Sequence, residues 1–77
     1  MDVQRLIAMA NDIARYFASE PEPKVGVEGV AEHLRKFWNL RMCEQLVSHV
    51  ESGGGGLDPM AVAAVRRLAA QRADSSA

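Results

Sequence analysis

The chain has 77 residues and a mass of 8.4 kDa, which is the size of one small domain. Nine Lys and Arg residues nearly balance ten Asp and Glu residues, and the net charge of −1 excludes a general electrostatic attraction for nucleic acid or an anionic membrane. The single cysteine, Cys43, excludes an internal disulfide and suits a reducing compartment. No apolar run reaches the roughly 18 residues of a membrane-spanning helix. The N-terminus also lacks the apolar block of a signal peptide, so we expect a cytoplasmic protein without a membrane span.

The small size of the domain also indicates that the protein has a binding partner. In a small domain, the burial of apolar surface roughly balances the conformational entropy that folding removes. Disulfides, metals and oligomerisation are the usual supplements, and the sequence offers neither a disulfide nor an evident metal cluster. We therefore expect a protein whose structure is completed by the surface of another subunit.

The first predicted helix spans about residues 3–18. Asp2 is positioned to cap its N-terminus, and Pro21 and Pro23 cannot continue it. Met9 and Tyr16 lie on a different sector of this helix and mark a candidate second contact face. The apolar stripe with helical spacing consists of Val3, Leu6, Ile7, Ala10, Ile13, Ala14 and Phe17.

The second predicted helix spans about residues 25–38. Gly26 and Gly29 each weaken it by about 1 kcal/mol relative to alanine, but a glycine can permit the close approach of another backbone. Phe37 is expected to point inward, whereas Trp38 fits a core position and an interface position equally well. The apolar side consists of Val27, Val30, Ala31, Leu34, Phe37 and Trp38.

Two further helices are predicted over about residues 40–52 and 58–71. A break near Asn39 keeps the apolar stripes in phase, and Asn39 can cap the third helix. The loop at 53–56 is all glycine, and Asp58 and Pro59 fit the cap and the first position of the fourth helix. The sequence thus predicts an all-α domain of four short helices over 1–72, followed by a frayed tail at 73–77.

The residues that carry chemistry do not form a known catalytic or metal-binding pattern. His33, Cys43 and His49 are separated by ten and six positions, which matches no zinc motif. Cys43 and His49 lie on different faces of one helix, and the apolar stripe around Cys43 predicts an inert thiol. The glycine loop lacks the ending of a phosphate loop. We therefore expect no catalytic, cofactor-binding or metal-binding residue in this chain.

The most informative segment is 33–42, which reads HLRKFWNLRM. It places Arg35, Lys36 and Arg41 around Phe37 and Trp38. Basic residues interleaved with aromatic residues occur in proteins that bind single-stranded nucleic acid. They are equally typical of protein interfaces, where Trp and Arg are frequent anchors. The neutral net charge argues against a nucleic-acid partner.

This segment also resembles the FW-x-P-R-M signature of the delta subunit of NAD-dependent, molybdenum-containing formate dehydrogenases, with Leu40 in place of the proline. The run LIAMANDI at 6–13 is similar to the L-x-x-M-A-N-x-I pattern of the family. The HVE at 49–51, the glycine loop and the GLDP at 56–59 are similar to the end of the family pattern, although the loop is richer in glycine. The resemblance covers about residues 2–70.

The resemblance implies a non-catalytic accessory subunit of a cytoplasmic complex that docks on the catalytic alpha subunit and supports assembly or stability. The larger subunits then carry the molybdopterin, the iron–sulfur clusters and the FMN that oxidise formate to CO2 and reduce NAD+. Two alternatives remain: a self-associating regulatory or chaperone-like protein that forms homodimers, and a small nucleic-acid-binding domain. The candidate contacts with the alpha subunit are Arg35, Phe37, Trp38, Arg41 and Met42.

Overall fold

The computed structural model describes the backbone of residues 2–76 and the side chains of residues 2–72. It contains four helices, namely α1 (Val3–Phe17), α2 (Pro23–Phe37), α3 (Leu40–Glu51) and α4 (Pro59–Ser76). No strand is present in the described part of the chain. The predicted all-α fold with four short helices is therefore confirmed.

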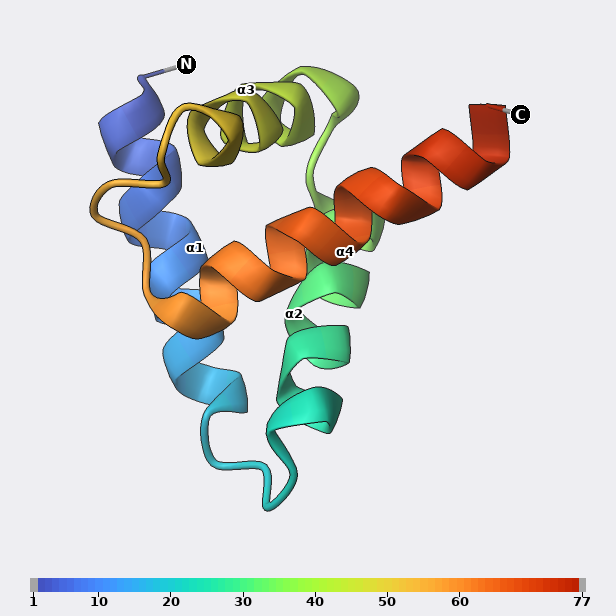
Figure 1. Cartoon of the computed structure of the whole chain (residues 1–77). Helices are drawn as coiled ribbons and strands as arrows, with labels where there is room; N and C mark the ends of the chain where they lie inside the picture. The colour runs from blue at the N-terminus through green and yellow to red at the C-terminus, as the bar shows by residue number, and fades with distance from the viewer. Residues whose placement is uncertain (1, 77) are drawn as a thin grey trace.

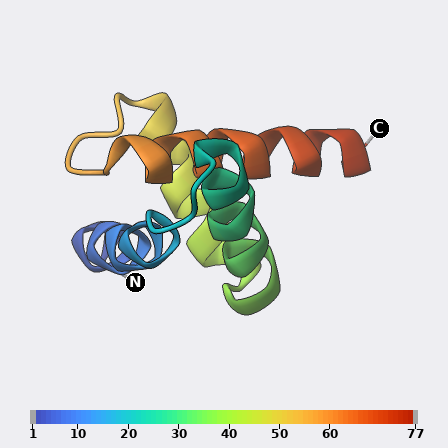
Figure 2. The same cartoon turned by 90° about the horizontal axis from the view of Figure 1, so that it is seen from below.

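Helices α1 and α2 run antiparallel, and α4 crosses one face of this pair (Figures 1 and 2). Helix α4 packs most extensively against α2, and α3 packs against α1 and α4. The C-terminal half of α4 extends beyond the other three helices in both views.

The core contains residues from all four helices. Most of its members come from the predicted apolar stripes, and no charged or polar side chain is buried among the described residues. The largest side chains with almost no exposure are Leu6, Val30, Leu34, Leu46, Val65 and Leu68.

The break between α2 and α3 forms without the proline of the family signature. Trp38 and Asn39 both have extended backbone angles, with φ of −95° and −74° and ψ of 140° and 168°. The Asn39 side chain then accepts a hydrogen bond from the Met42 N–H at 2.9 Å, as predicted. Asp2 caps α1 in the same way, by accepting from the Gln4 N–H at 3.1 Å.

Two helix ends differ from the sequence-based expectation. Helix α2 begins at Pro23 rather than near residue 25. The N–H groups of the first helical turn have no bonding partner within the helix, so a proline, which has no N–H, fits there. Helix α4 continues to Ser76 rather than ending near residue 71, since residues 69–73 are mostly good helix formers without a breaker. The backbone of 73–76 in the expected frayed tail is thus helical, while Ala77 and the side chains of 73–77 lie outside the described residues.

Candidate partner-binding surface

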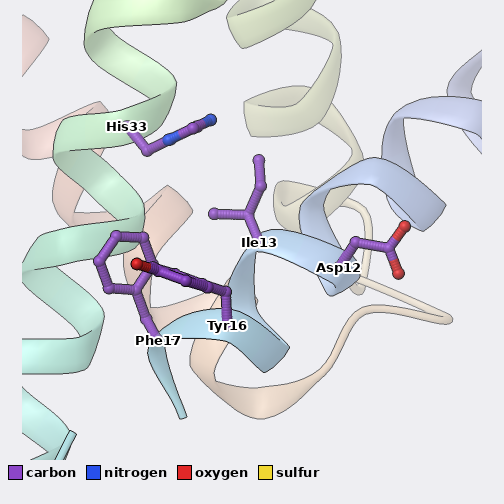
Figure 3. A pocket seen from close by; sticks show the side chains of 5 residues that line it. All are labelled: Asp12, Ile13, Tyr16, Phe17 and His33. Atoms are coloured by element: carbon purple, nitrogen blue, oxygen red, sulfur yellow. The ribbon is translucent and has the colours of Figure 1, made fainter. Parts of the chain in front are cut away.

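A hollow of about 460 Å³ opens between α1 and α2 (Figure 3). Its wall is mostly apolar, and the ring of Tyr16 stands beside that of Phe17 on one side while His33 faces them from α2. The lining residues are Asp12, Ile13, Tyr16, Phe17 and His33.

Phe37 lies next to His33 of this hollow, one turn further along α2. Its ring lies against that of His33, with the two ring centroids 4.8 Å apart. The Tyr16 and Phe17 rings meet edge to face at 5.0 Å on the opposite helix. We call the five lining residues together with Phe37 the aromatic groove. Two of its large side chains are solvent-exposed, since Tyr16 is 76% and Phe37 is 72% exposed.

Glycine in α2 makes the floor of the aromatic groove possible. The Phe17 ring lies directly on Gly29, where a Cβ atom would come within 2.5 Å of two ring carbons. One turn earlier, a Cβ on Gly26 would lie 2.9 Å from the carbonyl oxygen of Phe17. The two glycines therefore allow α1 to approach α2, as expected from the sequence, and they let an aromatic ring lie flat between the helices.

The five residues predicted to contact a partner do not form one surface. The inward orientation expected for Phe37 is wrong, because α2 ends at this residue and the extended backbone that follows turns the next side chain inward instead. Trp38 is consequently buried in the core at 8% exposure. Arg35 and Arg41 are exposed, and Met42 is partly buried against the core.

Asn11 of α1 and His49 of α3 both form hydrogen bonds with the segment that joins α3 to α4. The side-chain N–H of Asn11 donates to the Gly56 carbonyl at 2.8 Å, and its side-chain oxygen accepts from the Asp58 N–H at 2.8 Å. The His49 Nε2 lies 2.7 Å from the carbonyl oxygen of Gly55 in the same loop. The sequence did not predict this role for Asn11, and its only signal was the position of Asn11 within the LIAMANDI run.

The glycine loop itself needs glycine at several positions. Gly53, Gly54 and Gly56 have φ values of 126°, 68° and 85°, which side chains rarely tolerate. The backbone angles of this loop and its hydrogen bonds with α1 and α3 thus fix its conformation.

The comparisons with known proteins identify a family for this chain. The chain matches the family described as NADH-dependent formate dehydrogenase delta subunit FdsD over residues 5–65, a range that includes the glycine loop and the whole aromatic groove. The chain belongs to this delta-subunit family. The search of curated proteins found no match, and the search of solved structures found none either.

Removal of the Asn11 side chain is expected to destabilise the delta subunit by about 1–2 kcal/mol, because the part-buried Asp58 N–H then loses its acceptor. Urea denaturation of Asn11→Ala measures this loss. Asp12→Ala is the matched control, since Asp12 is exposed on the same helix and its ion pair with Arg15 contributes little. Equal stability of the two variants would show that Asn11 does not hold the loop.

The thiol of Cys43 is buried in the delta subunit and contacts the backbone of α2. Its Sγ donates to the Leu34 carbonyl at 3.8 Å, and burial raises the pKa of the Cys43 thiol, an effect that the nearby Arg72 partly opposes. A raised pKa keeps the thiol protonated and poorly nucleophilic at neutral pH.

Among the residues with described side chains, no three His, Cys, Asp or Glu residues lie close enough together to hold a metal ion.

The basic residues of segment 33–42 are engaged in part by a carboxylate. Glu32 accepts hydrogen bonds from the Arg35 guanidinium and lies 3.8 Å from the Lys36 ammonium. The hydrogen bond from Arg35 lowers the pKa of the Glu32 carboxyl, and the same bond raises the pKa of Arg35.

None of the described helices has the length and hydropathy that crossing a membrane would require.

Proposed function

We propose that this delta subunit is a non-catalytic accessory subunit of a cytoplasmic formate dehydrogenase complex. It docks on the catalytic alpha subunit and supports the assembly or stability of the complex. The family match over residues 5–65 is the observation that carries this proposal. In this scheme the molybdopterin, the iron–sulfur clusters and the FMN belong to the other subunits.

The aromatic groove is the surface that best fits the docking role. Large apolar side chains exposed next to one another are typical of interaction sites, and a tyrosine and a phenylalanine flank this hollow. Aromatic side chains that fill or border a pocket are frequent hot spots of protein interfaces. Tyr16 and Phe37 therefore become the leading contacts, and of the five sequence-based candidates Phe37 is the one that contributes to the groove.

The contacts of the titratable residues support a non-catalytic role. Cys43 bonds to the backbone of α2, His49 to the glycine loop, and His33 lies against the Phe37 ring. Each of these side chains has a structural partner, so packing accounts for its position.

Truncation of Phe37 is expected to reduce the recovery of the alpha subunit by at least about tenfold, because a hot-spot residue contributes about 2 kcal/mol or more to binding. The measurement is an affinity pull-down of the tagged full chain from its native cytoplasm, with mass spectrometry of the eluted subunits. Tyr16→Ala should give a loss of similar size.

Val25→Ala is the control for this pull-down, because Val25 is an exposed apolar residue outside the aromatic groove. Circular dichroism should show the helical content of the wild type for all variants. If Phe37→Ala and Tyr16→Ala both recover the alpha subunit as well as Val25→Ala does, the groove is not the docking surface. If instead the mass of the isolated chain in solution rises with its concentration, and Phe37→Ala abolishes this rise, the chain forms a homodimer through the groove.

A further inference from the structure

His33 is a polar side chain that faces the aromatic groove from α2 (Figure 3). It is partly buried, and its ring lies against the exposed ring of Phe37. Its ring nitrogens form no hydrogen bond with the described residues, whereas the Nε2 of His49 lies 2.7 Å from a carbonyl oxygen. A partner that enters the aromatic groove therefore covers an imidazole whose nitrogens are not already bound.

On α1, the charged residue that lines the groove is Asp12, which forms no ion pair with His33. Asp12 pairs instead with Arg15, with 3.2 Å between the carboxylate oxygen and the guanidinium nitrogen. Figure 3 shows the Asp12 carboxylate pointing away from the His33 imidazole. The other titratable group that α1 contributes to the lining is the phenol of Tyr16, and tyrosine is uncharged at neutral and acidic pH.

On α2, the nearest carboxylate along the chain belongs to Glu32, the residue before His33. Glu32 accepts hydrogen bonds from Arg35 and lies 3.8 Å from the Lys36 ammonium, and it forms no ion pair with His33. The described residues that line the hollow come from α1 and α2, and none of them belongs to α3 or α4. Within the described part of the chain, a positive charge on His33 thus has no carboxylate bound to it.

The charge of His33 determines what it costs to cover this side chain. Histidine is the residue that ordinarily changes its charge between about pH 5 and pH 8. Covering a neutral imidazole with an apolar surface removes the hydration of its nitrogens, whereas covering an unpaired imidazolium also removes the hydration of a full charge. The ring face of Phe37 offsets such a charge only weakly at an exposed site. Docking on the aromatic groove therefore favours the neutral form of His33.

We propose that His33 makes docking on the aromatic groove sensitive to pH: the neutral imidazole admits an apolar surface of the alpha subunit, and the protonated imidazole opposes it. This inference rests on the proposed function, which supplies the partner. The mostly apolar wall of the groove fits an apolar surface on that partner. A partner that binds the deprotonated form better binds more weakly as the pH falls, so docking weakens on acidification.

The same pull-down at about pH 7.5 and about pH 5.5 tests this inference. An ordinary histidine is about nine-tenths protonated at pH 5.5, so recovery of the alpha subunit by the wild type is expected to fall by up to about tenfold. His33→Gln stays neutral and is expected to lose less than about twofold over the same range, because an amide does not titrate there. His33→Lys keeps a positive charge and is expected to show low recovery at both pH values.

His49→Gln is the matched control, since it removes the other histidine of the chain outside the groove and should retain the pH dependence of the wild type. Circular dichroism at both pH values should show the helical content of the wild type for every variant.

The outcomes separate this inference from the proposed function. If the wild type recovers the alpha subunit equally well at both pH values, the inference is wrong while the docking proposal stands. The same conclusion follows if His33→Gln loses as much recovery at acidic pH as the wild type does. If the wild type recovers no alpha subunit at neutral pH, the proposed function fails and the inference fails with it.

Discussion

Replacement of Leu34 by alanine is expected to lower the free energy of unfolding by about 3 kcal/mol. Leu34 lies in the middle of the core at 0% exposure, so the substitution removes buried apolar surface and leaves a cavity. Small domains have a total stability of about 5–15 kcal/mol, and this chain of 77 residues belongs at the lower end of that range. Equilibrium denaturation in urea, followed by circular dichroism, measures the change.

Leu40→Ala removes the same atoms from a side chain that is 62% exposed. Its expected effect is within about 0.5 kcal/mol, because little buried area and no cavity are involved. The difference between the two leucines therefore isolates the contribution of burial. A loss of similar size in both variants would contradict the assignment of the core.

Truncation of Trp38 is expected to have an effect at least as large. Trp38→Ala should destabilise the domain by about 3–5 kcal/mol, because the indole is buried where α2 turns into α3. A variant this unstable is expected to be partly unfolded in the absence of a partner. Urea denaturation of the isolated chain gives the free-energy difference, and the amplitude of the helical signal gives the unfolded fraction.

Phe37→Ala is the neighbouring control, with an expected loss below about 1 kcal/mol since the ring is largely exposed. The two adjacent aromatic residues are thus expected to have opposite roles, with Trp38 needed for folding and Phe37 for docking. A Trp38→Ala variant with the stability of the wild type but without the alpha subunit would assign Trp38 to the interface instead.

The helices and most of the core could be predicted from the sequence because they depend on local periodicity. The stripes of α1 and α2 and the cap at Asn39 follow from residues a few positions apart. The prediction for Phe37 was wrong for the same reason, because an apolar stripe shows which residues share a face but not the residue at which the helix ends. When α2 ends at Phe37, the core position passes to Trp38.

The aromatic groove could not be predicted because it depends on how the helices pack. It requires Tyr16 and His33 to face each other from antiparallel helices. Asn11 likewise contacts residues 45 and 47 positions away. Of the two residues that the sequence placed on a candidate second contact face of α1, Tyr16 is exposed, whereas Met9 packs partly against the core.

The position of Trp38 also provides an optical reporter. The chain contains one tryptophan, and its indole is largely shielded from water at the point where α2 turns into α3. The wavelength and quenching of tryptophan fluorescence respond to the polarity and charge around the indole, so emission from this chain reports on a single place. A partner that contacts the junction of α2 and α3 should change that emission, whereas a ligand confined to the hollow between α1 and α2 should change it far less. Unlabelled protein can thus distinguish a contact at this junction from occupancy of the aromatic groove.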